Sequence, residues 1–179
     1  MTIRGWVVIP VALGLAAASI PAQQAIPKVS GTTLAGNSVG LPGAVHGKVG
    51  VLVVGFSKSS QGQVAARGRR LSADFNQSSS VVYFEVPMLA GAPRILRGMI
   101  VRQMGSTVPD AQRPHFLPLM ENEAGWRAVA HYDQSDDEYV LLLDGTSTIY
   151  WQTHGNATDA EYNMLRKQLQ SLVEQTGVR

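Results

Sequence analysis

Two near-continuous apolar runs dominate the middle of the chain. Residues 48–56 and 80–87 are rich in valine, with few polar positions, and such runs are typical of strands covered on both faces of a sheet. Between them, apolar residues recur on one helical stripe as far as Phe75. The pattern predicts a strand, a helix and a second strand, with Ser59 or Ser60 capping the start of the helix.

A second amphipathic stretch follows Pro93. Its pattern predicts a helix over Arg94–Met104, in which apolar side chains share one face and arginines share the other. The three prolines of residues 105–119 indicate a surface excursion, and residues 121–130 can form a short helix that buries Trp126 and Val129. The residues assigned to the two faces of the longer helix are Leu96, Met99 and Ile100 inward, and Arg94, Arg97 and Arg102 outward.

The C-terminal third alternates strand and helix signals. Residues 139–144 and 148–151 are short apolar segments joined by Gly145-Thr146-Ser147, which predicts a β-hairpin. Thr158 and Glu161 have the spacing of a capping box at the start of a last helix. Its apolar stripe consists of Tyr162, Leu165, Leu169 and Leu172, and Gly177 is a suitable stop.

The N-terminal segment has the pattern of an export signal. In residues 1–22, Arg4 precedes an apolar run over Trp6–Ala18, and small residues follow it. Cleavage after Ala22 would release an exported protein, whereas an uncleaved segment would anchor it to the membrane. Residues 23–46, rich in glycine, proline and small polar residues, are expected to form a flexible linker before one domain over residues 47–176.

Composition removes several classes of function. The chain of 179 residues contains no cysteine, which excludes a disulfide framework, a zinc–thiolate site, an iron–sulfur cluster and thiol catalysis. Its formal charge of +2 gives no reason to expect nucleic acid as a partner. No motif for a cofactor is present, so none is expected.

The predicted order of elements resembles the thioredoxin fold, in which a βαβ half precedes a ββα half. The resemblance rests on residues 51–56 with their polar turn and on the hairpin before Gly155. It implies an α/β thioredoxin-like domain with a central mixed sheet flanked by helices. The stretch from Asp144 to Trp151, followed by Gly155-Asn156-Ala157-Thr158, is also similar to the thioredoxin-like assembly-factor family of the mitochondrial ATP synthase.

The resemblance implies where a redox motif would lie. The cysteine pair of thioredoxin-like enzymes aligns with Ser60 and Gln63 in the sequence Ser60-Gln61-Gly62-Gln63, and no proline stands near Glu138, where the fold places its cis-proline. A serine hydroxyl forms no disulfide and stays neutral near neutral pH. Thiol–disulfide exchange and thiol peroxidase activity are therefore excluded.

Two other constellations are candidates for chemistry. Ser60 and Gln63, together with His131 and neighbouring acids, would form an enzyme site only if their side chains converged in one pocket. His131 with the acids of residues 133–137 lacks the ligand spacing of a calcium loop, which favours a solvated turn over a metal site.

The predicted function is that of an exported, non-redox protein that binds or assembles another protein. Its possible partner face is the arginine group Arg67, Arg69 and Arg70, and the methionines around residues 88–120 can alternatively line a flexible partner groove. Two alternatives remain open. One is an enzyme of non-thiol chemistry near Ser60, and the other is a scaffold tethered to a membrane through residues 1–22, the one segment expected to contact a membrane.

Overall fold

The structure is a computed structural model that describes residues 24–176. The predicted signal or anchor segment and Gly177 lie outside the described residues. Within the described part, no helix is both long enough and apolar enough to cross a bilayer.

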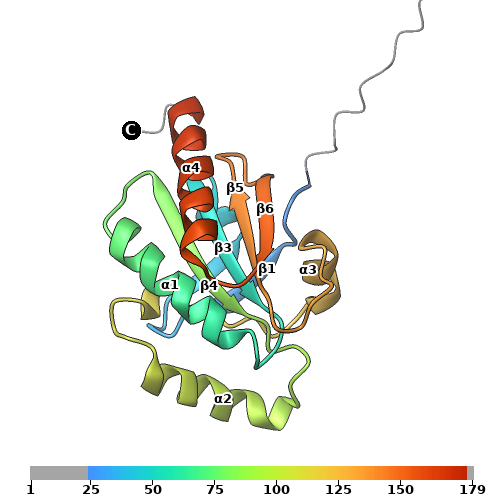
Figure 1. Cartoon of the computed structure of the whole chain (residues 1–179). Helices are drawn as coiled ribbons and strands as arrows, with labels where there is room; N and C mark the ends of the chain where they lie inside the picture. The colour runs from blue at the N-terminus through green and yellow to red at the C-terminus, as the bar shows by residue number, and fades with distance from the viewer. Residues whose placement is uncertain (1–23, 177–179) are drawn as a thin grey trace, which may run out of the picture.

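A four-stranded mixed sheet forms the centre of the molecule (Figure 1). The first two of its strands are parallel and the remaining neighbours are antiparallel, which confirms the predicted central mixed sheet. Every residue of the strand over Val49–Gly55 is buried, as expected for a strand covered on both faces. In spatial order the strands are β4 (Val81–Pro87), β3 (Val49–Gly55), β5 (Glu138–Leu143) and β6 (Ile149–Gly155).

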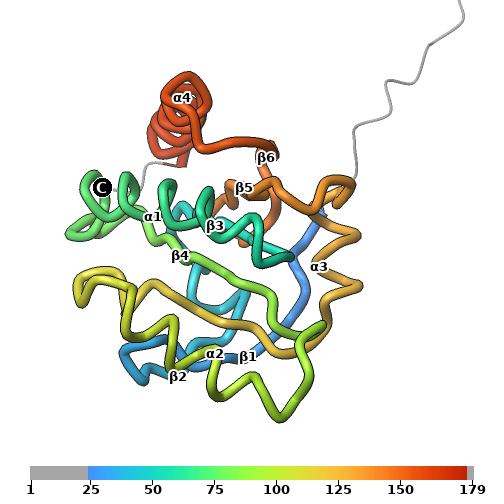
Figure 2. The backbone as a smooth tube through the Cα atoms, turned by 60° about the horizontal axis from the view of Figure 1, so that its bottom comes forward, coloured from blue at the N-terminus to red at the C-terminus, as the bar shows by residue number. Residues whose placement is uncertain are grey.

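Two helices cover one face of the sheet, α1 (Gln61–Phe75) and α4 (Asp159–Thr176) (Figure 2). Both helices direct their predicted apolar stripes at the sheet, so that Leu71 of α1 and Leu165 of α4 share one hydrophobic cluster with the valines of β3. The capping box is formed in part, because the Glu161 backbone N–H donates to Thr158 Oγ1 at 3.3 Å.

The predicted flexible linker over residues 23–46 is wrong for its described residues. They form a hairpin of β1 (Val29–Thr32) and β2 (Ser38–Leu41), followed by the 3-10 turn η1 (Gly43–Val45). Four of its apolar side chains enter the larger hydrophobic cluster, on the face of the sheet opposite α1 and α4. These residues are Ile26, Val29, Leu41 and Val45. The domain therefore begins before residue 47.

The same face is completed by α3 (Glu123–Val129) and by the chain just before it. Trp126 and Val129 are buried as predicted. Residues 105–119 are a surface excursion only in part, because their last residues run beside β4: the Leu117 backbone N–H donates to the Glu85 carbonyl at 2.8 Å. Before them, η2 (Arg113–His115) forms one short turn.

Helix α2 (Arg94–Thr107) stands off from the sheet at the end where β3 leads into α1 (Figure 1). None of its side chains is fully buried, and its predicted faces are only partly right. Ile100 faces the body and Arg94 and Arg102 are exposed, as predicted. Leu96 and Met99 point to solvent, whereas Arg97 points to the body of the protein. The guanidinium of Arg97 donates to the backbone carbonyls of Ala90, Ala92 and Met120 at 2.6, 2.9 and 3.1 Å.

Candidate functional site

The turn between β3 and α1 contains the positions that correspond to a redox motif. Ser60 is fully buried, and its hydroxyl donates to the Ser57 carbonyl at 3.0 Å. The Ser57 backbone N–H in turn approaches Ser60 Oγ at 3.4 Å. Ser60 therefore occupies the N-cap position of α1 but forms no side-chain cap, contrary to the predicted capping role.

The other serines of this turn fasten it to the loop before β5. Ser57 Oγ donates to the Ser135 carbonyl at 2.5 Å, and Ser59 Oγ donates to Asp136 Oδ1 at 2.6 Å. The Ser59 hydrogen bond lowers the pKa of Asp136, with Ser135 adding to the effect. These hydroxyls are used in holding two loops together.

The remaining motif positions have structural partners as well. Gln63 Nε2 donates to Asn156 Oδ1 at 2.9 Å, and the Ala157 backbone N–H donates to Gln63 Oε1 at the same distance, 2.9 Å. Gln61 Nε2 donates to the Ser57 carbonyl at 3.2 Å, while Gly62 is exposed. Gln63 thus joins the start of α1 to the loop that precedes α4.

Within residues 24–176, the side chains proposed for a non-thiol enzyme site have different hydrogen-bond partners. His131 Nδ1 lies 2.6 Å from Gln152 Nε2, whereas Ser60 donates to the Ser57 carbonyl and Gln63 to Asn156. In the neighbouring acidic turn, His154 Nδ1 lies 2.7 Å from Asp137 Oδ2. Among the described residues, no group of three or more histidines and carboxylates is arranged to hold a metal ion.

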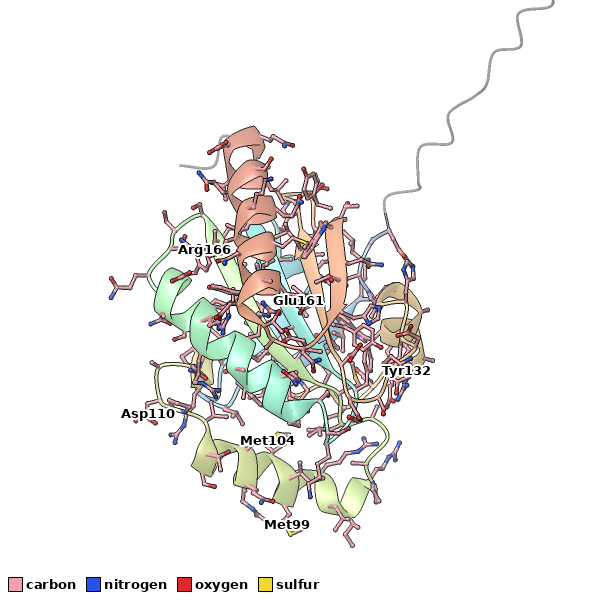
Figure 3. All side chains as sticks on the ribbon, viewed as in Figure 1. Met99, Met104, Asp110, Tyr132, Glu161 and Arg166 are labelled. Atoms are coloured by element: carbon pink, nitrogen blue, oxygen red, sulfur yellow. The ribbon has the colours of Figure 1, made fainter. Side chains whose placement is uncertain are left out.

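A buried ion pair lies beneath α1, where the sequence predicted a partner face. Arg67 is only 1% exposed, and its Nε and Nη2 atoms lie 2.7 and 2.5 Å from Glu138 Oε1. Glu161 of α4, labelled in Figure 3, places its Oε2 atom 3.7 Å from the same guanidinium. The predicted face therefore loses Arg67, because that side chain is buried against β5. Arg69 remains exposed, and Arg70 pairs with Asp159 at 2.5 Å.

A further carboxyl, that of Glu85 on β4, is buried beside this pair. Desolvation raises the pKa of Glu85 to about 8, a rise that Arg69 opposes. Desolvation also raises the pKa of Glu138 to about 7, although Arg67 acts against that rise. Oε1 of Glu85 has no hydrogen-bond partner among the residues that the structure describes. Sequence reasoning missed this cluster because its members are far apart in the chain. The one available signal was Glu85 itself, a glutamate inside an apolar strand.

The main concavity of this end of the molecule lies between the turn and α2. It is a half-open cleft of about 620 Å³. One wall comes from Phe56 and from the turn residues Ser57, Lys58 and Gln61, and the opposite wall comes from the inner side of α2. Its apolar lining consists mainly of Phe56, Met88, Leu89, Ile100, Met104 and Phe116. The sequence pointed to this place only through its methionines.

Comparisons with known proteins define the fold and no closer relationship. No family model and no curated protein sequence matches the chain. Among solved structures, a putative thiol:disulfide interchange protein DsbE from Chlorobium tepidum is similar with a TM-score of 0.59 and 12% identity, over 84% of this chain and 96% of that one. The exposed lipoprotein thioredoxin of Streptococcus pneumoniae strain TIGR4 gives a TM-score of 0.58 and 10% identity, over 79% and 99%.

A third similar structure is BsSco, a member of the Sco family of cytochrome c oxidase assembly proteins. Its TM-score is 0.56 and its identity 10%, over 89% of this chain and 97% of that one. At such identities the likeness concerns the fold alone. The chain is therefore an α/β protein with the thioredoxin-like fold. It lacks the cysteines on which thiol–disulfide exchange depends.

Proposed function

We propose that this chain is an exported, non-redox protein-binding or assembly module, and that it holds its partner through the outward face of α2. The observation that carries the proposal is the exposure of three large apolar side chains on that helix: Ile95 is 90%, Met99 52% and Leu96 40% exposed. Figure 3 shows Met99 on the side of α2 that faces away from the body. Clustered exposed apolar residues are a common mark of interaction surfaces.

The charge around this apolar group defines the expected partner. Arg94 and Arg102 are exposed on the same helix, and the sequence Arg94–Thr107 contains no acidic residue. A complementary protein surface would offer an apolar pocket bordered by aspartate or glutamate, since opposite potentials favour association and specificity. Arg97 supports such docking because its three hydrogen bonds to backbone carbonyls fix the N-terminal half of α2.

The lack of a reactive group at the turn favours binding over catalysis. The Ser57 and Ser60 hydroxyls donate to backbone carbonyls, which cannot act as a base. Ser59 donates to the Asp136 carboxylate at 2.6 Å, but the pKa of that carboxylate is lowered, so it is a weak base for activating a serine nucleophile. The proposal of an enzyme built on Ser60, Gln63 and His131 is correspondingly weaker.

Two of the similar structures lend support to the assembly and export parts of the proposal. One belongs to a family of cytochrome c oxidase assembly proteins, and another is an exposed lipoprotein. The similarity of residues 144–158 to ATP synthase assembly factors is a further reason to test assembly, and it remains a hypothesis. The export part predicts that the mature chain begins near Gln23, which mass spectrometry of the exported protein would determine; an intact N-terminus on membrane-bound protein would instead favour the tethered scaffold.

Capture of the partner tests the main proposal. The protein, tagged at its C-terminus, would be used to recover bound proteins from a native membrane and envelope extract. A variant with Ile95→Ser and Met99→Ser is expected to lose the partner, whereas Met164→Ser, which changes a methionine of α4 with 51% exposure, is expected to retain it. A second variant, Arg69→Glu with Arg70→Glu, tests whether the two remaining arginines of the predicted partner face contribute to binding.

The result would be decisive in either direction. Loss of one specific partner in the α2 variant alone would place the docking surface on that helix. Equal recovery by the α2 variant would overturn that location, and no enriched protein in any arm would contradict the binding function itself.

A further inference from the structure

The cleft beneath α2 has the properties of a ligand site, and this inference does not depend on the protein partner proposed for the opposite face of the helix. Its volume of about 620 Å³ is in the range of small-molecule sites, roughly 300–1,000 Å³. The lining is mainly apolar, with a few polar side chains among the turn residues, which is the usual composition of such sites.

The charge of the cleft is defined by two residues, Lys58 and Glu123, the titratable side chains among its lining. The negative charge of Glu123 is balanced by Arg127, whose Nε and Nη2 atoms donate to Glu123 Oε1 at 2.8 and 2.7 Å. Lys58 is exposed and forms no ion pair within the described part of the chain. The cleft therefore combines an apolar interior with one uncompensated positive charge.

We propose that this cleft binds an amphiphile with a single alkyl chain and a carboxylate head group. The chain would lie against Phe56, Met88 and Met104, and the carboxylate would face the ammonium group of Lys58. An alkyl chain suits these walls because it brings no hydrogen-bonding groups into them. A peptide would place backbone N–H and C=O groups against the same apolar side chains, where unpaired polar groups are unfavourable.

The methionines provide a direct readout of where such a ligand binds. Met88 and Met104 line the cleft, whereas Met99 and Met164 are about half exposed on other surfaces. Figure 3 shows Met104 and Met99 on opposite sides of α2. In full-length protein labelled with methyl-¹³C-methionine, dodecanoate below its micelle-forming concentration is expected to shift the Met88 and Met104 signals until one site is saturated. The Met99 and Met164 signals should remain in place.

The head group and the cleft are tested by separate variants. Dodecanoate should bind up to ~5-fold more tightly than dodecanol, the largest factor expected of one exposed ion pair, and dodecyltrimethylammonium should bind more weakly than both. Lys58→Gln should remove the preference for the carboxylate while leaving the affinity for dodecanol unchanged. Lys167→Gln, which changes an exposed lysine of α4, should alter neither affinity. Met104→Trp should narrow the cleft and weaken the binding of both ligands.

Three results would overturn the proposal. The first is equal shifts at Met99 or Met164, which would indicate unspecific adsorption. The second is a carboxylate preference that survives Lys58→Gln, and the third is the absence of saturable binding in a wild-type protein whose spectrum shows that it is folded.

Discussion

At the scale of single residues, the contact between α1 and β4 depends on the absence of one side chain. Gly68 lies directly over the buried carboxyl of Glu85, and a Cβ atom at this position would lie 2.0 Å from Glu85 Cδ and 2.2 Å from Oε1. Both groups are buried, so neither the helix nor the carboxyl can move aside without disturbing the packing of Arg67. The close approach of α1 to the sheet therefore requires glycine here.

Gly68→Ala tests this contact against a matched control. The substitution should lower the free energy of unfolding by ~1–3 kcal/mol, the usual cost of overpacking. Gly62→Ala, in the first turn of the same helix, places its methyl group where no other atom lies within 4 Å. It should be neutral or slightly stabilising because alanine favours helix. Urea denaturation of both variants measures the difference, and equal stabilities would show that α1 does not need glycine at this position.

The carboxyl of Glu85 should also make stability depend on pH. Its pKa is about 8 in the folded protein, against an ordinary value of 4.5. Between these values the folded state binds more protons than the unfolded state, so the free energy of unfolding falls as pH rises. The stabilising effect of the protonated group is complete below about 4.5 and is lost as pH passes through about 8. Glu138, with its pKa raised to about 7, acts in the same direction.

Glu85→Gln keeps the shape of the side chain and removes its titration. Relative to the wild type, the variant should gain stability as pH increases from about 5 to about 9, and its stability should fall less steeply over that range. Part of the slope should remain, because Glu138 is unchanged. Urea midpoints measured at several pH values would provide the test, and parallel curves for the two proteins would contradict the buried, protonated state of Glu85.

At the scale of elements, α2 is attached to the body mainly through one side chain. Its residues that face inward are half-buried at most. Arg97 donates hydrogen bonds to the carbonyls of Ala90 and Ala92, just before the helix, and to that of Met120. Such charge-assisted bonds are worth more than neutral ones. The position of α2, and with it the width of the cleft, should depend on this guanidinium.

Arg97→Met removes these bonds while keeping a long side chain. We expect amide hydrogens of α2 to exchange at least ~10-fold faster, since losing hydrogen bonds from a charged donor costs ~1.5–3 kcal/mol. The exchange of β3 and β5 should change little, because these strands open only with the whole domain. Arg102→Met on the exposed side of the same helix is the control. Unchanged exchange in the Arg97 variant would show that α2 is held by its apolar contacts instead.

The sequence predicted the elements better than their attachments. Apolar runs and stripes predicted the strands β3 and β4 and the helices α1 and α4. The prediction succeeded because burial of those residues determines both the type of element and the face that it turns toward the core. In α2 the same rule failed for Leu96, Met99 and Arg97, since Arg97 donates to three backbone carbonyls and no periodicity in the sequence reveals these bonds. Arg67 was assigned to the surface for a related reason. Its partner Glu138 is distant in the chain and becomes a neighbour only when α1 packs on the sheet.

At the scale of the whole molecule, the N-terminal hairpin is part of the folding unit. Its backbone joins the rest of the protein where the Leu34 N–H donates to the Phe116 carbonyl at 3.0 Å and the Gly47 N–H donates to the Gly145 carbonyl at 2.8 Å. Val45 packs against Gly50 of β3, where a Cβ atom would lie 3.0 Å from that of Val45. Composition concealed this role because the few apolar residues of the segment stand among glycines and small polar residues.

Leu41 offers the sharpest test of this integration. It is 3% exposed at the end of β2, so Leu41→Ala should lower the free energy of unfolding by ~2–5 kcal/mol through lost burial and the cavity left behind. Ser38→Ala, at an exposed position of the same strand, should change it little. A chain that begins at Gln24 should unfold in one cooperative transition. A chain that begins at Gly47 should lose that transition, because the part of the hydrophobic cluster that the hairpin covers would be exposed to solvent. Thermal unfolding followed by circular dichroism would distinguish the cases. A fragment from Gly47 that is stable and unfolds cooperatively would show that the hairpin is not needed for the fold.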